Sequence, residues 1–543
     1  MNEQKVRALI AGGETLTVEF KSDVEQLPDA ELIEVVVCLT NAQGGTLVVG
    51  VEDDGKVTGL HPKHQTHPGA LAAFIASRTV PPVSVEADFA KLPEGMVAVL
   101  VVPAARQPVS TSDGRLLVRY LDSKGKPGCR PLYSHELLSW KADRGLADFS
   151  ALPVTEARWE DLDPLEFARL RRMVEEYHGD TALLELDDER LARALGLIRA
   201  EDRAPTVAGL LLVGKESALR EYLPAHEVAF QVLRGSDVAM NEFRRWPLLR
   251  IYEWVVQAID VRNEERELMV GAFRVGVPRY DRRGFREAIS NALIHRDYRR
   301  LGAIHVQLHD HFMLVSNPGG FVAGVRSDTL LTATPHPRNP LLADAFKRVG
   351  LVERTGRGVG IIYGGQLQNG RPAPDYSRST EVSVSVSLSS RPADLDFVLL
   401  AIHSNRKLGR ALTAEDLLIL WEIWRQGPTD ISILAQILQQ GPEHAREVLA
   451  DLIKVGLAEA DDSSFRIAPG LQQNLIELFE AGIADPAVYI LGYLQQHDRI
   501  TRQQVVKMYG LSEKQAEYRL KQLVTAGRLR LVSKGRSAHY VLA

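Results

Sequence analysis

The sequence predicts a multidomain protein of the α/β and α+β classes, and three observations lead to this prediction. The chain has 543 residues, which is enough for three to five domains. Residues 1–145 and 275–390 both combine short apolar strands with amphipathic helices, as α/β units do. Residues 395–472 and 473–543 each follow several helices with a strand hairpin, which is the order of elements in a winged helix.

Composition and cysteine usage predict a cytoplasmic protein that does not enter a membrane. Hydrophobic residues make up 45% of the chain, yet no uninterrupted apolar run approaches the roughly 18 residues of a membrane helix. The first fourteen residues have no apolar core of the signal-peptide kind. Cys38 and Cys129 show no CxxC spacing, which argues against a disulfide framework or a cysteine-built zinc site and for a reducing compartment.

Charge is distributed unevenly along the chain. The net charge is −5, but residues 501–543 hold nine Lys or Arg against two Glu, a local charge of +7 that leaves −12 for the rest. A basic tail on an acidic body predicts a defined polyanion-binding face. Residues 413–470 hold ten acidic against four basic side chains, which predicts a structural or dimerising module.

Three carboxylates near strand ends in the first domain are candidate metal ligands. Glu14 and Glu19 flank a short strand, Lys21 follows two residues later, and Asp53 ends the next apolar strand. Converging carboxylates can hold Mg²⁺ or Mn²⁺, which would activate water against a phosphodiester while Lys21 steadies the charge. Spacing alone favours the simpler interpretation, in which these are solvated acids at strand ends.

The run VEFK followed by TNAQGGTLVVGVEDDGKVTGL resembles the Schlafen-type AlbA-like domain, over roughly residues 5–140. In ribonuclease members of that family two Glu and one Asp carry cleavage, and the motif places these roles on Glu14, Glu19 and Asp53. Many bacterial members are described as DNA-binding domains, so the resemblance implies nucleic-acid binding more firmly than cleavage. The basic residues that follow a strand are either phosphate contacts or an ordinary solvated loop: Arg119, Lys124, Lys126 and Arg130.

Residues 146–274 are predicted to be a helix-rich connecting region with strands at 207–213 and 228–233. In residues 275–390 we expect a helix at 285–298, a hairpin over 303–320 and an alternating strand at 381–388. This second α/β unit resembles the nucleotide-binding unit of the GHKL ATPases, in the divergent form found in RecG-like transcriptional regulators. The resemblance covers about residues 283–375.

The GHKL resemblance implies a nucleotide pocket with bound Mg²⁺ and ATP. It implies that Glu287 polarises water and that Asn291, one turn later, coordinates Mg²⁺. The segment aligned with the adenine-reading motif contributes Asn317, Gly319 and Gly320, but Pro318 alters that turn and puts adenine specificity and hydrolysis in doubt. Lid glycines that would let the backbone approach phosphate are Gly356, Gly358 and Gly360. The alternative is a degenerate fold kept for scaffolding or dimer contacts.

Two short motifs in the chain are excluded as active sites. Gly209 to Lys215 fits the GxxxxGK half of a P-loop, but its four interior residues are bulky and apolar and predict a buried strand. His295-Arg296-Asp297 lacks the downstream Asn of a kinase catalytic loop. We therefore expect no P-loop helicase activity.

The last segment is predicted to be a DNA-binding winged helix. Ser512 would cap a recognition helix over 513–527, with Leu520 and Leu523 packed inward. The basic residues offered to DNA by this helix, by the start of the hairpin and by its tip are Lys514, Arg519, Lys521, Arg528, Lys534 and Arg536.

The sequence as a whole favours a DNA-binding, transcriptional-regulator-like protein with a nucleotide-sensing domain. Its expected partners are nucleic acid, duplex DNA first, and further copies of itself in a homodimer or a higher homo-oligomer. Two alternatives remain: a metal-dependent nuclease acting on DNA or RNA in stress or defence, and a non-catalytic assembly platform.

Overall fold

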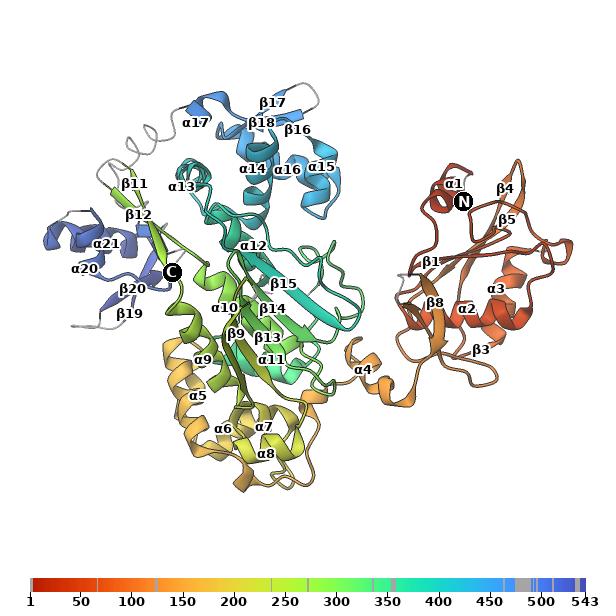
Figure 1. Cartoon of the computed structure of the whole chain (residues 1–543), viewed down its shortest axis with the longest axis horizontal. Helices are drawn as coiled ribbons and strands as arrows, with labels where there is room; N and C mark the ends of the chain where they lie inside the picture. Colours follow the sequence, from red (N-terminus) through yellow and green to blue (C-terminus); the bar gives the residue numbers. More distant parts are fainter. Residues whose placement is uncertain are drawn as a thin grey trace. The chain divides into compact units, whose positions relative to one another are not determined.

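A computed structural model confirms a mixed α/β architecture of several parts (Figure 1). It divides into two compact units, Met1–Asp148 with Val322–Gly324, and Phe149–Phe321 with Val325–Ala543. The structure describes residues 3–65, 67–122, 126–235, 237–270, 273–334, 336–352, 358–461, 464–473, 490–491, 493–494, 497–509, 512–532 and 538–543.

The first unit is built on a four-stranded sheet with the order β1-β2-β5-β4. β1 runs parallel to β2, and the other neighbours are antiparallel. The elements of this unit are α1 (Glu3–Ala11), β1 (Val18–Lys21), α2 (Asp29–Asn41), β2 (Gly45–Val49), η1 (Pro62–His64), α3 (Pro68–Ser77), β3 (Thr79–Val80), β4 (Glu86–Leu92), β5 (Gly95–Val102), β6 (Ser110–Thr111), β7 (Leu117–Leu121), β8 (Pro127–Pro131), η2 (Ser134–Glu136) and α4 (Leu137–Ala142).

The helix α2 forms the centre of the first unit because its apolar side chains are buried almost all round. It ends in a tight turn into β2, as the glycine pair predicts. Gly44 has a φ of 75°, and an added Cβ would lie 2.7 Å from the carbonyl oxygen of Val102. A residue with a side chain would be strained there on both counts.

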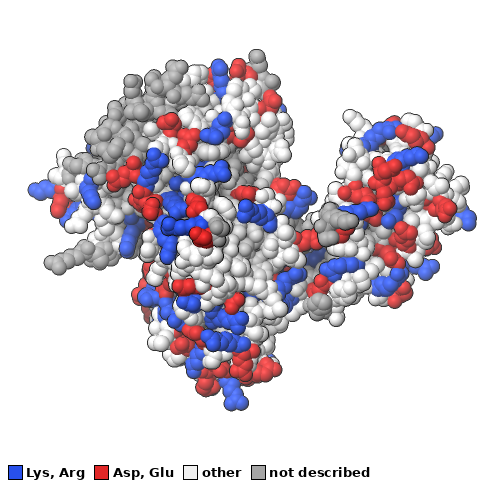
Figure 2. All heavy atoms as spheres, viewed as in Figure 1, with Lys and Arg blue, Asp and Glu red and all other residues white. Residues whose placement is uncertain are grey.

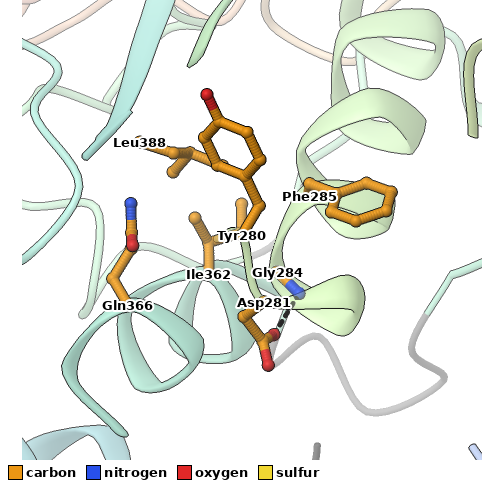
Figure 3. A pocket seen from close by; sticks show the side chains of 7 residues that line it. All are labelled: Tyr280, Asp281, Gly284, Phe285, Ile362, Gln366 and Leu388. Carbon is orange, nitrogen blue, oxygen red and sulfur yellow. Dashed lines mark hydrogen bonds between the residues drawn. The ribbon is translucent and has the colours of Figure 1, made fainter. Parts of the chain in front are cut away.

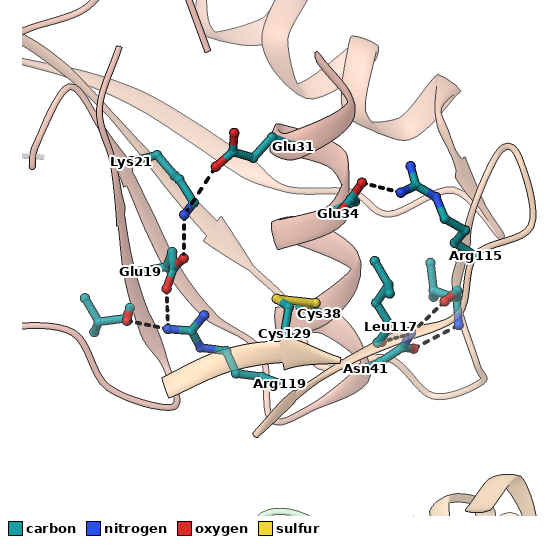
Figure 4. The surroundings of a disulfide bond; sticks show 12 residues. Glu19, Lys21, Glu31, Glu34, Cys38, Asn41, Arg115, Leu117, Arg119 and Cys129 are labelled. Atoms are coloured by element: carbon teal, nitrogen blue, oxygen red, sulfur yellow. Dashed lines mark hydrogen bonds and ion pairs between the residues drawn. A yellow bond between two sulfur atoms is a disulfide. The ribbon is translucent and has the colours of Figure 1, made fainter. Parts of the chain in front are cut away.

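The expectation that the two cysteines stay unpaired is wrong in this structure. Cys38 on α2 and Cys129 on β8 form a disulfide, with their Cα atoms 5.9 Å apart (Figure 4). Their 91-residue separation and the lack of a spacing motif gave no sign of this pairing, which arises because the β7–β8 hairpin packs on α2.

The second unit contains a five-stranded sheet with the order β10-β9-β13-β14-β15. β9 pairs in parallel with β13, so the segment predicted to connect the two α/β domains contributes two strands to the sheet itself. The elements up to this sheet's last strand are η3 (Phe149–Ala151), η4 (Trp159–Asp161), α5 (Pro164–Glu176), η5 (Thr181–Glu185), α6 (Asp188–Ala194), α7 (Val207–Val213), α8 (Glu216–Tyr222), β9 (Val228–Arg234), β10 (Asp237–Arg244), α9 (Leu248–Asp260), β11 (Glu265–Val270), β12 (Phe273–Pro278), α10 (Arg282–His295), β13 (Ile304–Leu308), β14 (Phe312–Pro318), α11 (Pro340–Val349), α12 (Gly358–Gln368) and β15 (Ser383–Ser389).

The predicted strand at 207–213 is wrong, because these residues form the helix α7. The side chain of Thr206 caps its first turn by accepting a hydrogen bond from the amide of Gly209, and the helix ends at Gly214. All seven residues are buried in the large core shared by α5, α9 and α10. A helix closed in this way offers no phosphate-binding loop, so the rejection of the P-loop still holds.

The remaining residues form two smaller groups of helices and hairpins. Each has an apolar core, one around α14 and one around α21. Their elements are α13 (Leu395–Leu408), α14 (Ala414–Gln426), β16 (Thr429–Asp430), α15 (Ile431–Ile437), α16 (Pro442–Lys454), β17 (Ala458–Asp461), β18 (Ser464–Ile467), α17 (Pro469–Gln473), α20 (Arg502–Tyr509), α21 (Glu513–Thr525), β19 (Leu529–Val532) and β20 (His539–Leu542). Within the described ranges, every helix is too short or too polar to cross a membrane.

Candidate functional site

The carboxylate of Glu19 is enclosed by two cations in the first unit (Figure 4). Glu19 lies within β1 and is 7% exposed. One of its oxygens lies 3.0 Å from Nζ of Lys21, which also reaches Glu31 at 3.4 Å. Its other oxygen pairs with the guanidinium of Arg119 from β7. Both oxygens are therefore engaged by protein side chains.

Glu14 and Asp53 lie near Glu19 but in different surroundings. Glu14 accepts a hydrogen bond from the amide of Phe20 at 3.0 Å. Burial raises the pKa of Glu14, and the negative charges of Glu19 and Asp53 raise it further. Asp53 is exposed and lies 3.7 Å from Nζ of Lys126. Glu14 is therefore close enough to Glu19 and Asp53 to interact with both electrostatically.

This arrangement does not fit a divalent cation. Among the described residues, no three His, Cys, Asp or Glu side chains are grouped so that they could hold a metal ion. Arg119 and Lys21 occupy the positions around Glu19 that a cation would need. We therefore derive no metal-dependent step from Glu14, Glu19 and Asp53 in this conformation.

The basic residues predicted to contact phosphate differ in their availability. Arg119 is neither solvated nor open to phosphate, contrary to both interpretations of the sequence. Its side chain is 0% exposed and donates to the carbonyl oxygens of Thr15 and Val18 at 3.0 and 3.2 Å. Lys126 is exposed, whereas Arg130 donates to both carboxylate oxygens of Glu136. Lys124 lies outside the described residues. Acidic and basic side chains are interspersed over the visible face of this unit, with no uniform basic coat (Figure 2).

In the second unit, α10 carries the residues of the predicted nucleotide pocket. Glu287 is 7% exposed, and Asn291 follows one turn later on the same face. The carboxylate of Glu287 lies against Gly358 at the start of α12, where an added Cβ would overlap it. Glu287 and Asn291 therefore share one face of α10, and the carboxylate of Glu287 packs against Gly358. Gly360 faces Ala414, and Gly356 lies outside the described residues.

The segment aligned with the adenine-reading motif serves packing in this structure. Asn317 is 5% exposed at the end of β14. Gly319 has a φ of 99°, and a side chain there would overlap the guanidinium of Arg338. Gly320 packs as closely on the backbone of Glu381. These contacts leave no room beside the two glycines for a base, so this half of the pocket fits a nucleotide poorly.

A recess lies beside the first turn of α10 (Figure 3). Asp281 caps the helix by accepting a hydrogen bond from the amide of Gly284 at 2.6 Å. Burial raises the pKa of Asp281 to about 6. Nε2 of Gln366 is buried and has no hydrogen-bond partner among the described residues. The sequence analysis missed Asp281, although an Asp just before an apolar helix is a cap signal.

The His295-Arg296-Asp297 segment has a structural role. Arg296 is 0% exposed and donates to the carbonyl oxygens of Asp297 and Gly302, at 3.1 and 2.6 Å. Asp297 pairs with Arg299 and Arg300. These contacts tie the end of α10 to the following loop, which agrees with its exclusion as a kinase motif.

The C-terminal helix α21 has one apolar and one polar side. Ser512 caps it together with Gln515, and Ala516, Leu520 and Leu523 are buried, as the sequence predicted for Ser512, Leu520 and Leu523. Lys514 and Arg528 are exposed, and Arg519 is half-buried. Lys521 pairs with Glu517 at 2.9 Å. Lys534 and Arg536 lie outside the described residues.

The C-terminal segment also contacts α10. Asp498 lies 2.7 Å from the guanidinium of Arg286 and 3.5 Å from that of Arg282. Arg286 also donates to the hydroxyl of Tyr252 at 2.8 Å and lies over the ring of Tyr177. These residues place an ion-pair cluster one residue from Glu287.

Together, the sheet topologies and these sites define a chain with a Schlafen-like domain and a RecG-like ATPase-type domain. Residues 14–127 match the family "Schlafen, AlbA_2", and residues 302–388 match "Putative ATP-dependent DNA helicase recG C-terminal". Residues 139–229 match a domain of unknown function, DUF8451. The two-domain architecture expected from the sequence is confirmed.

A solved structure resembles the chain over its whole length. The crystal structure of the DIP2311 protein from Corynebacterium diphtheriae is 23% identical, with a TM-score of 0.50 and coverage of 99% of each chain. At this identity the likeness concerns the fold. No curated protein matches the chain.

Proposed function

We propose that this nucleic-acid-associated protein is a DNA-binding, transcriptional-regulator-like protein whose C-terminal segment is a winged helix that contacts duplex DNA. The observation that carries the proposal is α21, which buries Leu520 and Leu523 and exposes Lys514 on a segment with a local charge of +7. A capped helix with one apolar side and one polar side that offers an exposed lysine suits a recognition helix in the major groove. The names of the two matched families, Schlafen AlbA_2 and RecG helicase, agree with nucleic-acid association.

The proposal includes a sensing role for the domain around α10. Glu287 and Asn291 would hold a Mg²⁺-bound nucleotide, ATP being the one implied by the GHKL resemblance. Bound there, the ion would neutralise phosphate charge, while this chain's own residues position it. The protein would act as a homodimer or a higher homo-oligomer, since paired winged helices recognise paired half-sites.

The test incubates the full chain with labelled duplex DNA, single-stranded DNA and structured RNA, with Mg²⁺ or Mn²⁺, followed by native and denaturing gels. A salt-sensitive shift of intact duplex is expected, because each phosphate contact releases counterions. The variant K514E should weaken this shift and lower the salt slope by about 1. The matched control is K454E, which changes an exposed lysine on α16 in the acidic segment and should leave binding unchanged.

The second candidate function is a metal-dependent nuclease of the Schlafen kind, which requires Glu19 to be released from Arg119 and Lys21 before a cation can bind. The raised pKa of Glu14 beside Glu19 and Asp53 favours it, because crowded carboxylates are a common feature of catalytic sites. Cleavage in the same gels, lost in E19A while binding persists, would replace the regulator by this enzyme. Neither shift nor cleavage would favour an assembly platform.

A further inference from the structure

The β7–β8 hairpin is a two-stranded sheet of its own that packs on α2 along β7, with Leu117 against the apolar core of the first unit. Asn41 on α2 donates to the carbonyl oxygen of Leu117 at 2.9 Å. Arg119 joins the hairpin to β1, and the Cys38–Cys129 disulfide joins it to α2. Since a two-stranded hairpin is marginally stable by itself in water, its packing on α2 and these attachments together hold it in place.

The disulfide and the Arg119 ion pair are on the same rung of this hairpin. Cys129 lies directly opposite Arg119 in the strand register. Cross-strand partners in an antiparallel pair point to the same face, so fixing Cys129 on α2 also fixes Arg119 against Glu19 (Figure 4). The disulfide therefore helps to hold Arg119 on the Glu19 carboxylate.

Arg119 is buried with one of its donors unmatched in the described part of the chain, although its other nitrogens donate to Thr15 and Val18 and pair with Glu19. Its side chain is 0% exposed, and its Nη1 has no hydrogen-bond partner among the described residues. A buried guanidinium with an unmatched donor is costly, and release into water removes that cost. Cys38 is fully buried, whereas Cys129 is exposed on β8, so a reductant can reach the bond from the β8 side.

We propose that the Cys38–Cys129 pair is a redox site that controls access to Glu19. In the oxidised chain the hairpin is clamped and Arg119 covers the carboxylate. A dithiol reductant attacks the sulfur of Cys129, Cys38 leaves as a thiolate, and the second thiol of the reductant resolves the mixed disulfide. Two electrons and two protons pass to the cysteines, and the dithiol becomes a disulfide. The hairpin then opens, uncovers Glu19 and brings Arg119 to the surface beside Lys126.

The experiment compares the full chain after treatment with diamide and after treatment with dithiothreitol. Mass spectrometry without reductant should find the Cys38–Cys129 linkage in the oxidised sample. Hydrogen exchange in residues 117–121, 127–131 and 18–21 should be at least tenfold faster after reduction, while residues 97–102 of the central strand β5 stay unchanged. The variant C129S should exchange like reduced protein in both conditions. The variant S84A, which changes an exposed serine just before β4, should respond like wild type.

The outcomes test this proposal separately from the DNA-binding function. The proposal rests on that function only where it gives the exposed Arg119 and Lys126 a role in binding. Absence of the linkage after oxidation, or equal exchange in both states, overturns the clamp whatever the DNA gels show. Faster exchange with tighter duplex binding after reduction supports the clamp and a role of the hairpin in binding. Faster exchange with unchanged DNA binding supports the clamp and places the DNA contact elsewhere.

Discussion

We predict that removing the charge of Glu19 destabilises the first unit more than removing the charge of Arg119. E19Q leaves Arg119 fully buried with the carbonyl oxygens of Thr15 and Val18 as acceptors and no anion. Breaking a buried pair from one side costs about 3–5 kcal/mol, and we expect the lower end, about 3 kcal/mol, because those carbonyls remain. R119M leaves Glu19 with Lys21 at 3.0 Å, so its cost should be about 1 kcal/mol.

The assay is hydrogen exchange of β1 in the full, oxidised chain, which reports the free energy of local opening. A loss of about 3 kcal/mol speeds exchange about 150-fold, against about fivefold for R119M. The double variant should recover part of the E19Q loss, since no buried cation is then left alone. E86Q, an exposed carboxylate on β4, is the control and should change nothing. Equal losses for E19Q and R119M would refute the reasoning, because they would mean that Lys21 contributes nothing to Glu19.

Three other changes test the remaining contacts. D281N keeps an N-cap for Gly284 but removes a carboxyl whose pKa burial raises to about 6. Because the folded pKa is raised, the contribution of this aspartate to the free energy of unfolding is complete below pH 3.8 and falls by about 3 kcal/mol as the pH rises through 6. Urea unfolding at pH 4 and pH 7 should show a smaller difference in stability for the variant than for the native chain. An equal difference would contradict the assignment to Asp281. G358A should lower the free energy of unfolding by about 1–3 kcal/mol, because its Cβ would overlap Glu287. G360A, whose Cβ would lie 3.8 Å from Ala414, is the control and should be neutral or stabilising. Hydrogen exchange in α10 and α12 compares the two variants. C129S should destabilise the oxidised first unit by about 2–4 kcal/mol and leave the reduced unit unchanged, as read by exchange in α2; a loss in both states would mean that Cys129 acts through packing alone.

Local patterns in the sequence predicted what depends on nearest neighbours. Alternating residues marked β13 and β14, helical spacing placed Glu287 and Asn291 on one face of α10, and Ser512 gave the start of α21. The run at 207–213 was assigned to a strand because four to eight consecutive apolar residues fit a buried strand and a buried helix equally. Its Thr206 cap was the signal that could have decided between them.

Contacts between distant segments could not be predicted in this way. The disulfide joins residues 91 apart, and Arg119 meets Glu19 across 100 residues of chain. An Arg is ordinarily exposed, and the two cysteines have no spacing that marks a pair, so only the packing of the β7–β8 hairpin on α2 reveals either contact. The parallel pairing of β9 with β13 likewise depends on the fold and not on either strand's own pattern.

The helix α10 carries the buried cap at Asp281, the Asp498 contact and the candidate nucleotide residue Glu287 in sequence. Its first turn is capped by the buried Asp281, and Arg282 and Arg286, from its first and second turns, hold Asp498 of the C-terminal segment. The next residue is Glu287, packed on Gly358. A ligand that moves the Glu287 carboxylate would also strain the preceding residue, Arg286. This arginine is bonded to Tyr252 and to Asp498. Since Glu287 is closely packed on Gly358 and Arg286 is bonded on both sides, such a shift would be transmitted to Asp498 or resisted by the cluster. Under the proposed function, this contact is the route by which nucleotide binding would change the placement of the DNA-binding segment.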